Sequence, residues 1–137
     1  MIRKLALTFA AFAVATLAFT AEPAASLVSQ EALLARQQRG DAALFVLDVR
    51  TPEEFAAGHI PGAVNIPHDQ VAARLMDVPK DKDVVIYCRS GRRSAIAAEA
   101  LAANGYTRLG HLEGDMQAWE AKGRPVERPA GAKASGQ

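Results

Sequence analysis

Strand patterns and helix patterns alternate along the middle of this chain. Residues 43–49 and 83–88 are apolar except for one aspartate in each run, and residues 106–112 form a third candidate strand. Strands that are apolar on both faces are typical of covered parallel sheets, and their alternation with helices is typical of α/β folds. The sequence therefore predicts an α/β domain, with a mostly parallel sheet and helices on both of its faces.

Capping residues mark where the helices begin and end. Thr51 can cap a helix, Pro52 suits its first position, and Glu54 stands where a capping box needs an acidic side chain. Residues 58–67 contain two glycines and two prolines, which predicts a turn-rich connector with a short extended piece. The other helices are expected over residues 29–40, 69–76, 92–105 and 115–123, with these caps and stops: Ser29, Gly40, Asp69, Gly105, Asp115 and Gly123.

The first 21 residues form a segment of a different kind. Arg3 and Lys4 precede a run without charge, Leu5 to Phe19, and small residues follow it. This order is typical of a secretory signal peptide, and the run is shorter than the roughly 20 residues that a membrane-spanning helix needs. We therefore expect residues 1–21 to be a signal peptide and the mature protein to be periplasmic in a bacterium, without membrane attachment. An uncleaved anchor is the alternative.

The remaining composition gives two further bounds. The chain has 16 Lys and Arg against 15 Asp and Glu, so its overall charge does not favour a nucleic acid as partner. Residues 128–137 are mostly Pro, Gly, Ala and Ser with little to bury, which predicts a flexible tail. Residues 26–127 are left as one domain of ordinary size.

Cys88 is the single cysteine of the sequence, so an intramolecular disulfide is excluded. Exported domains commonly pair their cysteines, and an unpaired thiol there is buried and inert, paired between molecules, or reactive. Sites in parallel α/β folds lie at the carboxyl ends of the strands, which is where Cys88 is expected. A cationic segment follows it directly: Arg89, Ser90, Gly91, Arg92, Arg93 and Ser94.

Residues 88–94 predict an anion-binding loop around a thiol. Gly91 tolerates the positive φ that a tight strand-to-helix turn can need, and the helix that follows adds unpaired N–H groups and the positive end of its dipole. Converging amides and guanidinium groups favour the thiolate, which is the nucleophilic form. We predict Cys88 as the catalytic nucleophile and the next six residues as the substrate-binding set: Arg89, Ser90, Gly91, Arg92, Arg93 and Ser94.

Residues 88–94 have two alternative interpretations. An unpaired cysteine often simply packs in a core, but three cations so near a core residue would be costly to bury, and at a helix N-terminus they oppose the dipole unless an anion is bound. Cysteine phosphatases place five residues between the nucleophile and the arginine that holds phosphate. Here that position is Ser94, so the loop is one residue short and favours a smaller group, such as one extra sulfur on Cys88.

Three motifs of the chain resemble the rhodanese family, in its single-domain form. Residues 47–67, "LDVRTPEEFAAGHIPGAVNIP", are similar to the family's first signature. Residues 84–101, "VVIYCRSGRRSAIAAEAL", resemble its active-site loop and helix, and residues 105–119, "GYTRLGHLEGDMQAW", its closing segment. The resemblance extends from about Ser29 to Val126. The family usually has two glycines after the last strand, and the second is Asp115 here, which we expect to alter the cap of the closing helix but not the chemistry.

The resemblance implies a rhodanese-like domain with a five-stranded sheet and the activity of a sulfurtransferase. Cys88 would attack the sulfane sulfur of a donor such as thiosulfate, sulfite would leave, and a persulfide would remain. Cyanide, a thiol or a protein acceptor would then take the sulfur. The amides of residues 89–94 would stabilise the persulfide, and Arg89 or Arg92 would most directly touch the donor. The resemblance implies no metal and no organic cofactor, because the sulfur is carried covalently.

Structural roles are expected for most other polar residues. Asp48 and Arg50 should form an ion pair, to which Glu54 could contribute. His59 is expected to hydrogen-bond the backbone of its connector, and Trp119 to pack on the sheet. The remaining histidines lack the spacing of metal ligands: His68 and His111.

Three functions stay open at this level. The leading one is a thiosulfate sulfurtransferase. A persulfide carrier that passes sulfur to a partner needs the same thiol, so the sequence does not separate the two. An oxyanion enzyme of the phosphatase or arsenate-reductase kind is disfavoured by the short loop.

Overall fold

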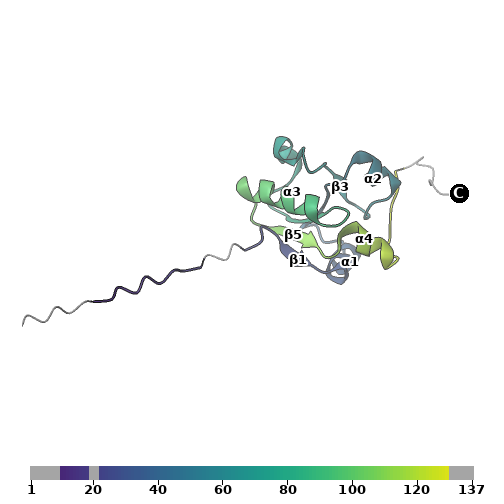
Figure 1. Cartoon of the computed structure of the whole chain (residues 1–137). Helices are drawn as coiled ribbons and strands as arrows, with labels where there is room; N and C mark the ends of the chain where they lie inside the picture. Colours follow the sequence, from purple (N-terminus) through teal and green to yellow (C-terminus); the bar gives the residue numbers. More distant parts are fainter. Residues whose placement is uncertain (1–9, 19–21, 130–137) are drawn as a thin grey trace, which may run out of the picture.

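Five parallel strands form one sheet in the computed structural model, which describes residues 10–18 and 22–129 (Figure 1). The strand order is β1-β5-β4-β2-β3, and each adjacent pair is parallel. The strands are β1 (Ser26–Val28), β2 (Leu44–Asp48), β3 (Val64–Asn65), β4 (Asp83–Tyr87) and β5 (Leu109–Leu112). The predicted α/β class and parallel sheet are confirmed.

Helices cover both faces of this sheet, as Figure 1 shows for α3 on one side and α1 and α4 on the other. The α-helices are α1 (Gln30–Gln38), α2 (Pro52–Ala57), α3 (Arg92–Ala103) and α4 (Asp115–Ala121). Two short 3₁₀ turns, η1 (Val71–Ala73) and η2 (Leu75–Asp77), complete the layer that contains α3.

Alternation along β4 divides the core into two buried clusters. Val84 and Ile86 pack in the cluster that includes α3, whereas Val85 and Tyr87 pack in the cluster that includes α1 and α4. Successive side chains of a strand point to opposite faces, so an apolar run is buried on both sides only when helices cover both. Trp119 is fully buried in the second cluster, which confirms its expected packing role.

Local capping signals were accurate in the first half of the chain. The Ser29 side chain accepts a hydrogen bond from the Ala32 amide and caps α1. Thr51 and Glu54 form both bonds of a capping box at the start of α2. Both helices therefore begin where their short-range sequence patterns predicted.

Three expectations about the elements were wrong. Residues 69–76 do not form one helix capped by Asp69; the chain makes two 3₁₀ turns there, and the first of them buries Val71. The third strand begins at Leu109 rather than at residue 106. Asp115 is not the cap of the closing helix, because Gly114, with φ 74°, takes that position and Asp115 is the first helical residue. The three-residue edge strand β1 was too short to give a pattern of its own.

Residues 10–18 extend away from the domain in Figure 1, whereas the segment after α4 lies against the connector before β3. Of the predicted signal peptide, residues 1–9 and 19–21 lie outside the described residues, and residues 10–18 have no regular secondary structure. Within the described ranges, no helix combines the length and apolarity that crossing a bilayer requires.

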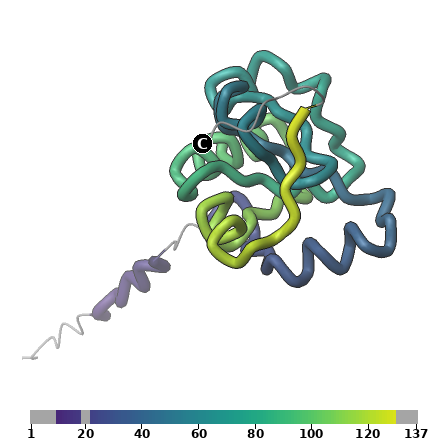
Figure 2. Tube along the Cα trace, turned by 90° about the vertical axis from the view of Figure 1, so that its right-hand side faces the viewer, coloured from purple at the N-terminus to yellow at the C-terminus, as the bar shows by residue number. Residues whose placement is uncertain are grey.

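After α4 the chain runs back across the molecule, and His59 and Glu127 form an antiparallel bridge there (Figure 2). Residues 130–137 of the predicted tail also lie outside the described part.

Candidate active site

The loop between β4 and α3 carries the single thiol. Gly91 has φ 114° and occupies the N-cap position of α3, and no side chain caps this helix end. The first amides of an α-helix have no acceptor within the helix, so those of Arg92, Arg93 and Ser94 are available to an anion. The Gly91 amide donates to the Cys88 Sγ over 3.0 Å. The loop therefore supplies one hydrogen-bond donor to the sulfur, the Gly91 amide, and places the first amides of α3 beside it.

Cys88 itself is only 1% exposed and belongs to the apolar cluster under α3. Burial alone would also suit an inert thiol. The sulfur nevertheless accepts a backbone hydrogen bond, and the next two residues, Arg89 and Ser90, are exposed. Cys88 thus lies at the base of the loop, with its sulfur hydrogen-bonded to the Gly91 amide.

The three arginines of the loop have different roles. The Arg93 guanidinium makes two hydrogen bonds to the Glu54 carboxylate, at 2.6 and 3.0 Å, and so joins α3 to the start of α2. This bidentate pairing lowers the pKa of Glu54 to about 2. Arg89 and Arg92 are exposed. They are therefore better placed than Arg93 to attract an anion from solvent, and the partner of Glu54 is Arg93 rather than Arg50.

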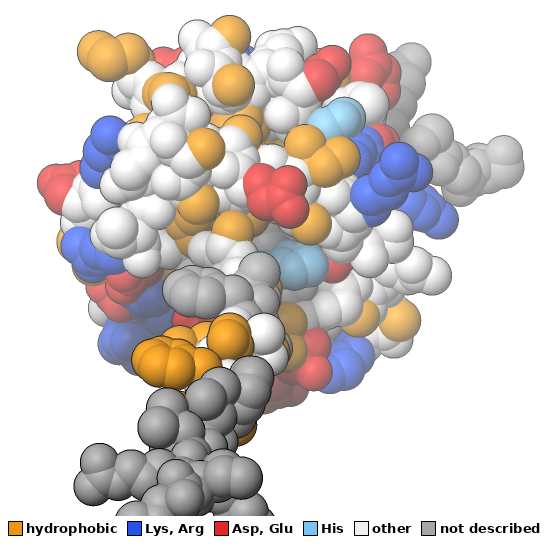
Figure 3. Space-filling model, turned by 60° about the vertical axis from the view of Figure 1, so that its left-hand side comes forward, with side chains coloured by type: hydrophobic (Ala, Val, Ile, Leu, Met, Phe, Trp, Pro, Cys, Tyr) orange, Lys and Arg blue, Asp and Glu red, His pale blue; other side chains and the backbone are white. Residues whose placement is uncertain are grey.

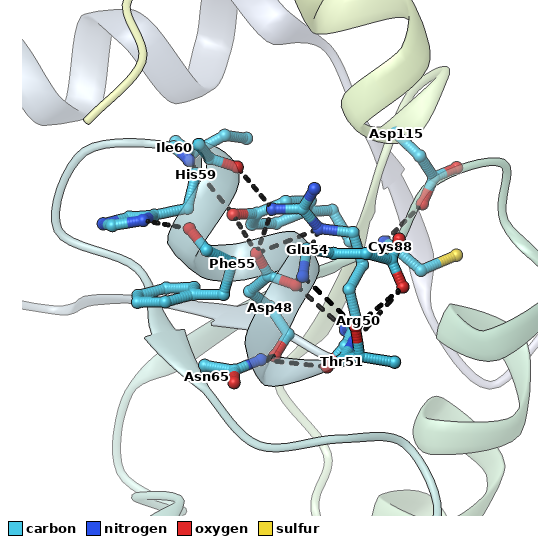
Figure 4. A network of polar contacts seen from close by, with 12 residues as sticks. Asp48, Arg50, Thr51, Glu54, Phe55, His59, Ile60, Asn65, Cys88 and Asp115 are labelled. Atoms are coloured by element: carbon cyan, nitrogen blue, oxygen red, sulfur yellow. Dashed lines mark hydrogen bonds and ion pairs between the residues drawn. The ribbon is translucent and has the colours of Figure 1, made fainter. Parts of the chain in front are cut away.

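Beside the loop, a buried polar network joins β2, β3 and β4 (Figure 4). The Arg50 guanidinium donates to the Asp48 carboxylate over 2.7 Å, which confirms the expected ion pair, and also to the Gly58 carbonyl over 2.8 Å. The Tyr87 hydroxyl donates to Asp48 over 2.6 Å, and burial raises the pKa of Tyr87, so the hydroxyl keeps its proton. Asn65 donates to the carbonyls of Asp48 and Arg50. The network fixes the sheet edge from which the loop leaves.

His59 has the structural role that was expected. Its Nδ1 lies 2.9 Å from the Phe55 carbonyl, and its ring stacks on the Phe55 ring with centroids 3.6 Å apart. The ring is therefore used to tie the connector to the end of α2. Among residues 10–18 and 22–129, no group of three or more His, Cys, Asp and Glu side chains could hold a metal ion.

Asp115 is a site residue that sequence reasoning missed. Its Oδ1 accepts hydrogen bonds from the Cys88 amide at 2.9 Å and from the Ser94 hydroxyl at 3.0 Å, and Figure 4 shows the carboxylate next to Cys88. His111 Nε2 lies 3.0 Å from both carboxylate oxygens. The available signal was an acidic residue at the carboxyl end of β5, four positions after a histidine, on the edge that also carries Cys88.

The pKa values of His111 and Asp115 shift in opposite directions, and both shifts favour the charged forms. The hydrogen bond to Asp115 is the main cause that raises the pKa of His111 above its ordinary value. Burial opposes ionisation of Asp115, but the bonds from His111, the Cys88 amide and Ser94 outweigh it, so the pKa of Asp115 is lowered. The pair is therefore an ion pair at pH values below the raised pKa of His111.

Comparison with known proteins shows the family to which this chain belongs. The model of the rhodanese-like domain matches residues 29–122. The chain belongs to the rhodanese family. A protein named sulfurtransferase from Allochromatium vinosum is 44% identical over 88 residues, which is 64% of this chain and 82% of that protein. The thiosulfate sulfurtransferase PspE of Escherichia coli is 40% identical over 70 residues, 50% of this chain and 67% of its own length.

Solved structures agree with the rhodanese fold. The rhodanese-like domain of the Anabaena protein Alr3790 superposes with a TM-score of 0.68 at 28% identity and covers 85% of this chain and 92% of that one. Two further curated relatives match over only 45% and 61% of their own length. The rhodanese domain thus occurs in proteins of different size. The assignment of this chain to the sulfurtransferases rests on the family and on the relatives that are named sulfurtransferases.

The Glu54–Arg93 pair of this rhodanese domain is expected to contribute to stability. Glu54→Gln keeps a capping side chain but removes the charge, so the free energy of unfolding should fall by about 1 kcal/mol at neutral pH. The pKa of Glu54 is depressed in the folded state, so its contribution is present above the ordinary value of 4.5 and is lost as the pH falls toward about 2. Urea unfolding of both proteins across this range measures the difference.

Glu53→Gln is the matched control, because Glu53 is exposed on the same turn of α2. That variant should stay within about 0.5 kcal/mol of the wild type. A Glu54→Gln effect no larger than that of Glu53→Gln at neutral pH would show that the pair contributes nothing to folding.

Proposed function

We propose that this protein is a rhodanese-type thiosulfate sulfurtransferase that works through a persulfide on Cys88. The observation that carries the proposal is the hydrogen bond from the Gly91 amide to the Cys88 sulfur, at the uncapped start of α3. The helix dipole and the unpaired amides there stabilise negative charge on the sulfur. The names of two sulfurtransferase relatives, one of them a thiosulfate sulfurtransferase, support the same chemistry.

The proposed transfer has two balanced steps. The Cys88 thiolate attacks the sulfane sulfur of thiosulfate; the new S–S bond forms as the bond to the sulfite group breaks, and sulfite leaves with the bonding electron pair. A thiolate or cyanide then attacks the outer sulfur of the persulfide, and Cys88 leaves as a thiolate again. The exposed guanidinium groups of Arg89 and Arg92 attract the doubly charged donor. No redox partner is needed, because the oxidation state of the sulfane sulfur is passed on with the atom.

The proposed location is the bacterial periplasm, and the proposed partners are small sulfur donors and a thiol, cyanide or protein acceptor. The basic, apolar and small-residue order of residues 1–21 supports export. Fractionation of cells that express the full chain tests this part, and recovery of the protein in the cytoplasm would contradict it.

Mass spectrometry of the intact protein tests the central step. After incubation with thiosulfate, the wild type is expected to gain one sulfur atom, and cyanide should remove it with formation of thiocyanate. Repeated turnover identifies an enzyme, whereas one slow discharge that a protein acceptor accelerates identifies a carrier. Hydrolysis of an aryl phosphate without any sulfur gain would overturn the proposal in favour of an oxyanion enzyme.

A further inference from the structure

The buried Asp115 and the partly exposed His111 are hydrogen-bonded to each other beside the loop that carries the sulfur. Asp115 is 2% exposed and bonds at once to the amide of Cys88, to Ser94 in the first turn of α3, and to His111 of β5. A Cβ atom placed on Gly91 would lie 3.2 Å from Asp115 Oδ2 and 3.4 Å from His111 Cε1. The pair therefore contacts the loop from below, at the glycine whose amide binds the sulfur.

The backbone at Asp115 is strained in a way that points to a role at the site. Its φ of 53° is the one positive value at a residue other than glycine in the described part of the chain. A left-handed conformation is unfavourable for a side chain with a Cβ, although aspartate tolerates it better than most. Such strain persists where the surrounding contacts enforce it, and it is concentrated at functional sites. At Asp115 the surrounding contacts include the hydrogen bond from the Cys88 amide.

The charge of this pair matters for the reaction. A lone carboxylate beneath the loop would oppose both the thiolate of Cys88 and an anionic donor, whereas a protonated His111 cancels that charge. A further titratable group near His111 is Glu99 of α3, which lines with His111 and Ser94 a cavity of about 130 Å³. Figure 3 shows acidic and histidine side chains close together on this side of the molecule. Since Asp115 and Glu99 are both acidic, His111 supplies the positive charge.

We propose that His111 is a positioning residue whose protonation, acting through Asp115, sets the net charge beneath the Cys88 sulfur and thereby its reactivity toward anionic donors. This inference rests on the proposed function for the identity of the anionic donor. The effect of the pair's charge on Cys88 does not depend on that function. The hydrogen bond to Asp115 raises the pKa of His111, so the favourable protonated form persists to higher pH than in an unpaired histidine and is lost as the pH rises further. Cys88 gains thiolate as the pH rises, so the two effects have opposite signs.

Two conservative variants separate the charges of the pair. His111→Gln keeps an amide donor for Asp115 but cannot carry a charge, so the carboxylate is never neutralised. Asp115→Asn keeps an acceptor for the Cys88 amide and removes the negative charge. His111→Gln should behave at every pH like the wild type at alkaline pH, whereas Asp115→Asn, in which only His111 can titrate, should never show that loss of reactivity.

Alkylation of Cys88 by iodoacetate and by iodoacetamide measures the local charge without any sulfur chemistry. The ratio of the two rates compares an anionic with a neutral reagent in the same protein, so the thiolate fraction cancels. In the wild type this ratio should fall by about fivefold to tenfold between about pH 6 and 9. The ratio should be low and flat in His111→Gln and should stay above that value at every pH in Asp115→Asn.

The rate of persulfide formation from thiosulfate, measured over the same range, should follow the same order among the three proteins. Ratios that coincide in all three proteins would overturn the inference, whatever the sulfur chemistry. If the ratios differ as expected but thiosulfate loads no sulfur onto the wild type at any pH, the charge control stands and the proposed donor is wrong. The two failures are therefore distinguishable.

Discussion

Cys88→Ser is expected to abolish sulfur loading from thiosulfate and all thiocyanate formation. Serine preserves the size of the side chain and its contact with the Gly91 amide, but its hydroxyl is not ionised at neutral pH and cannot hold a second sulfur. The loss should be at least about a thousandfold in turnover, as is usual when a covalent nucleophile is removed. Thiocyanate release and intact mass measure it together.

Met76→Ser is the matched control, because it also replaces sulfur by a hydroxyl. Met76 is 99% exposed in η2, outside the proposed active site. Its variant should load sulfur and turn over as the wild type does, and the thermal unfolding of both variants checks that the fold is kept. Turnover that survives in Cys88→Ser would rule out the persulfide mechanism, since the sequence holds no other cysteine.

The position of Cys88 could be predicted from sequence because the signals are local. An apolar strand followed within a few residues by a glycine and a helix pattern gives a strand-to-helix turn, and the parallel fold puts that turn at the edge where sites occur. The same holds for the capping box, whose partners Thr51 and Glu54 are three residues apart, and for the ion pair of Asp48 and Arg50, which are two residues apart. Short-range geometry decides each of these contacts.

The contacts that were missed join elements far apart in the sequence. Glu54 and Arg93 are 39 residues apart, and Asp115 lies 27 residues after Cys88. Each pair meets only because the strand order brings the carboxyl ends of β2, β4 and β5 to one edge of the sheet. Asp115 was expected to cap the closing helix, and its contacts with the loop were missed for this reason. Its side chain enters the base of the active-site loop, which no pattern along α4 itself could show.

The buried ion pair of Asp48 and Arg50 is the basis for the second large effect. Asp48 is 0% and Arg50 5% exposed, and both belong to the network that holds the end of β2 beside β4. A buried pair contributes little net free energy relative to an apolar pair of the same shape, but the removal of one partner leaves an uncompensated buried charge. Loss of the carboxylate would also remove the acceptor of the Tyr87 hydroxyl.

Asp48→Ala is therefore expected to lower the free energy of unfolding by about 3–5 kcal/mol, a large share of the roughly 5–15 kcal/mol that a domain has. Tyr87→Phe removes a donor to Asp48 and the acceptor of the Ile60 amide without creating a buried charge, so it should cost only about 1–3 kcal/mol. Asp69→Ala, at an exposed aspartate, should change the value by less than about 0.5 kcal/mol. Urea denaturation of the three variants orders them, and a loss for Asp48→Ala no greater than that for Tyr87→Phe would show that the charge of Arg50 is compensated by groups other than Asp48.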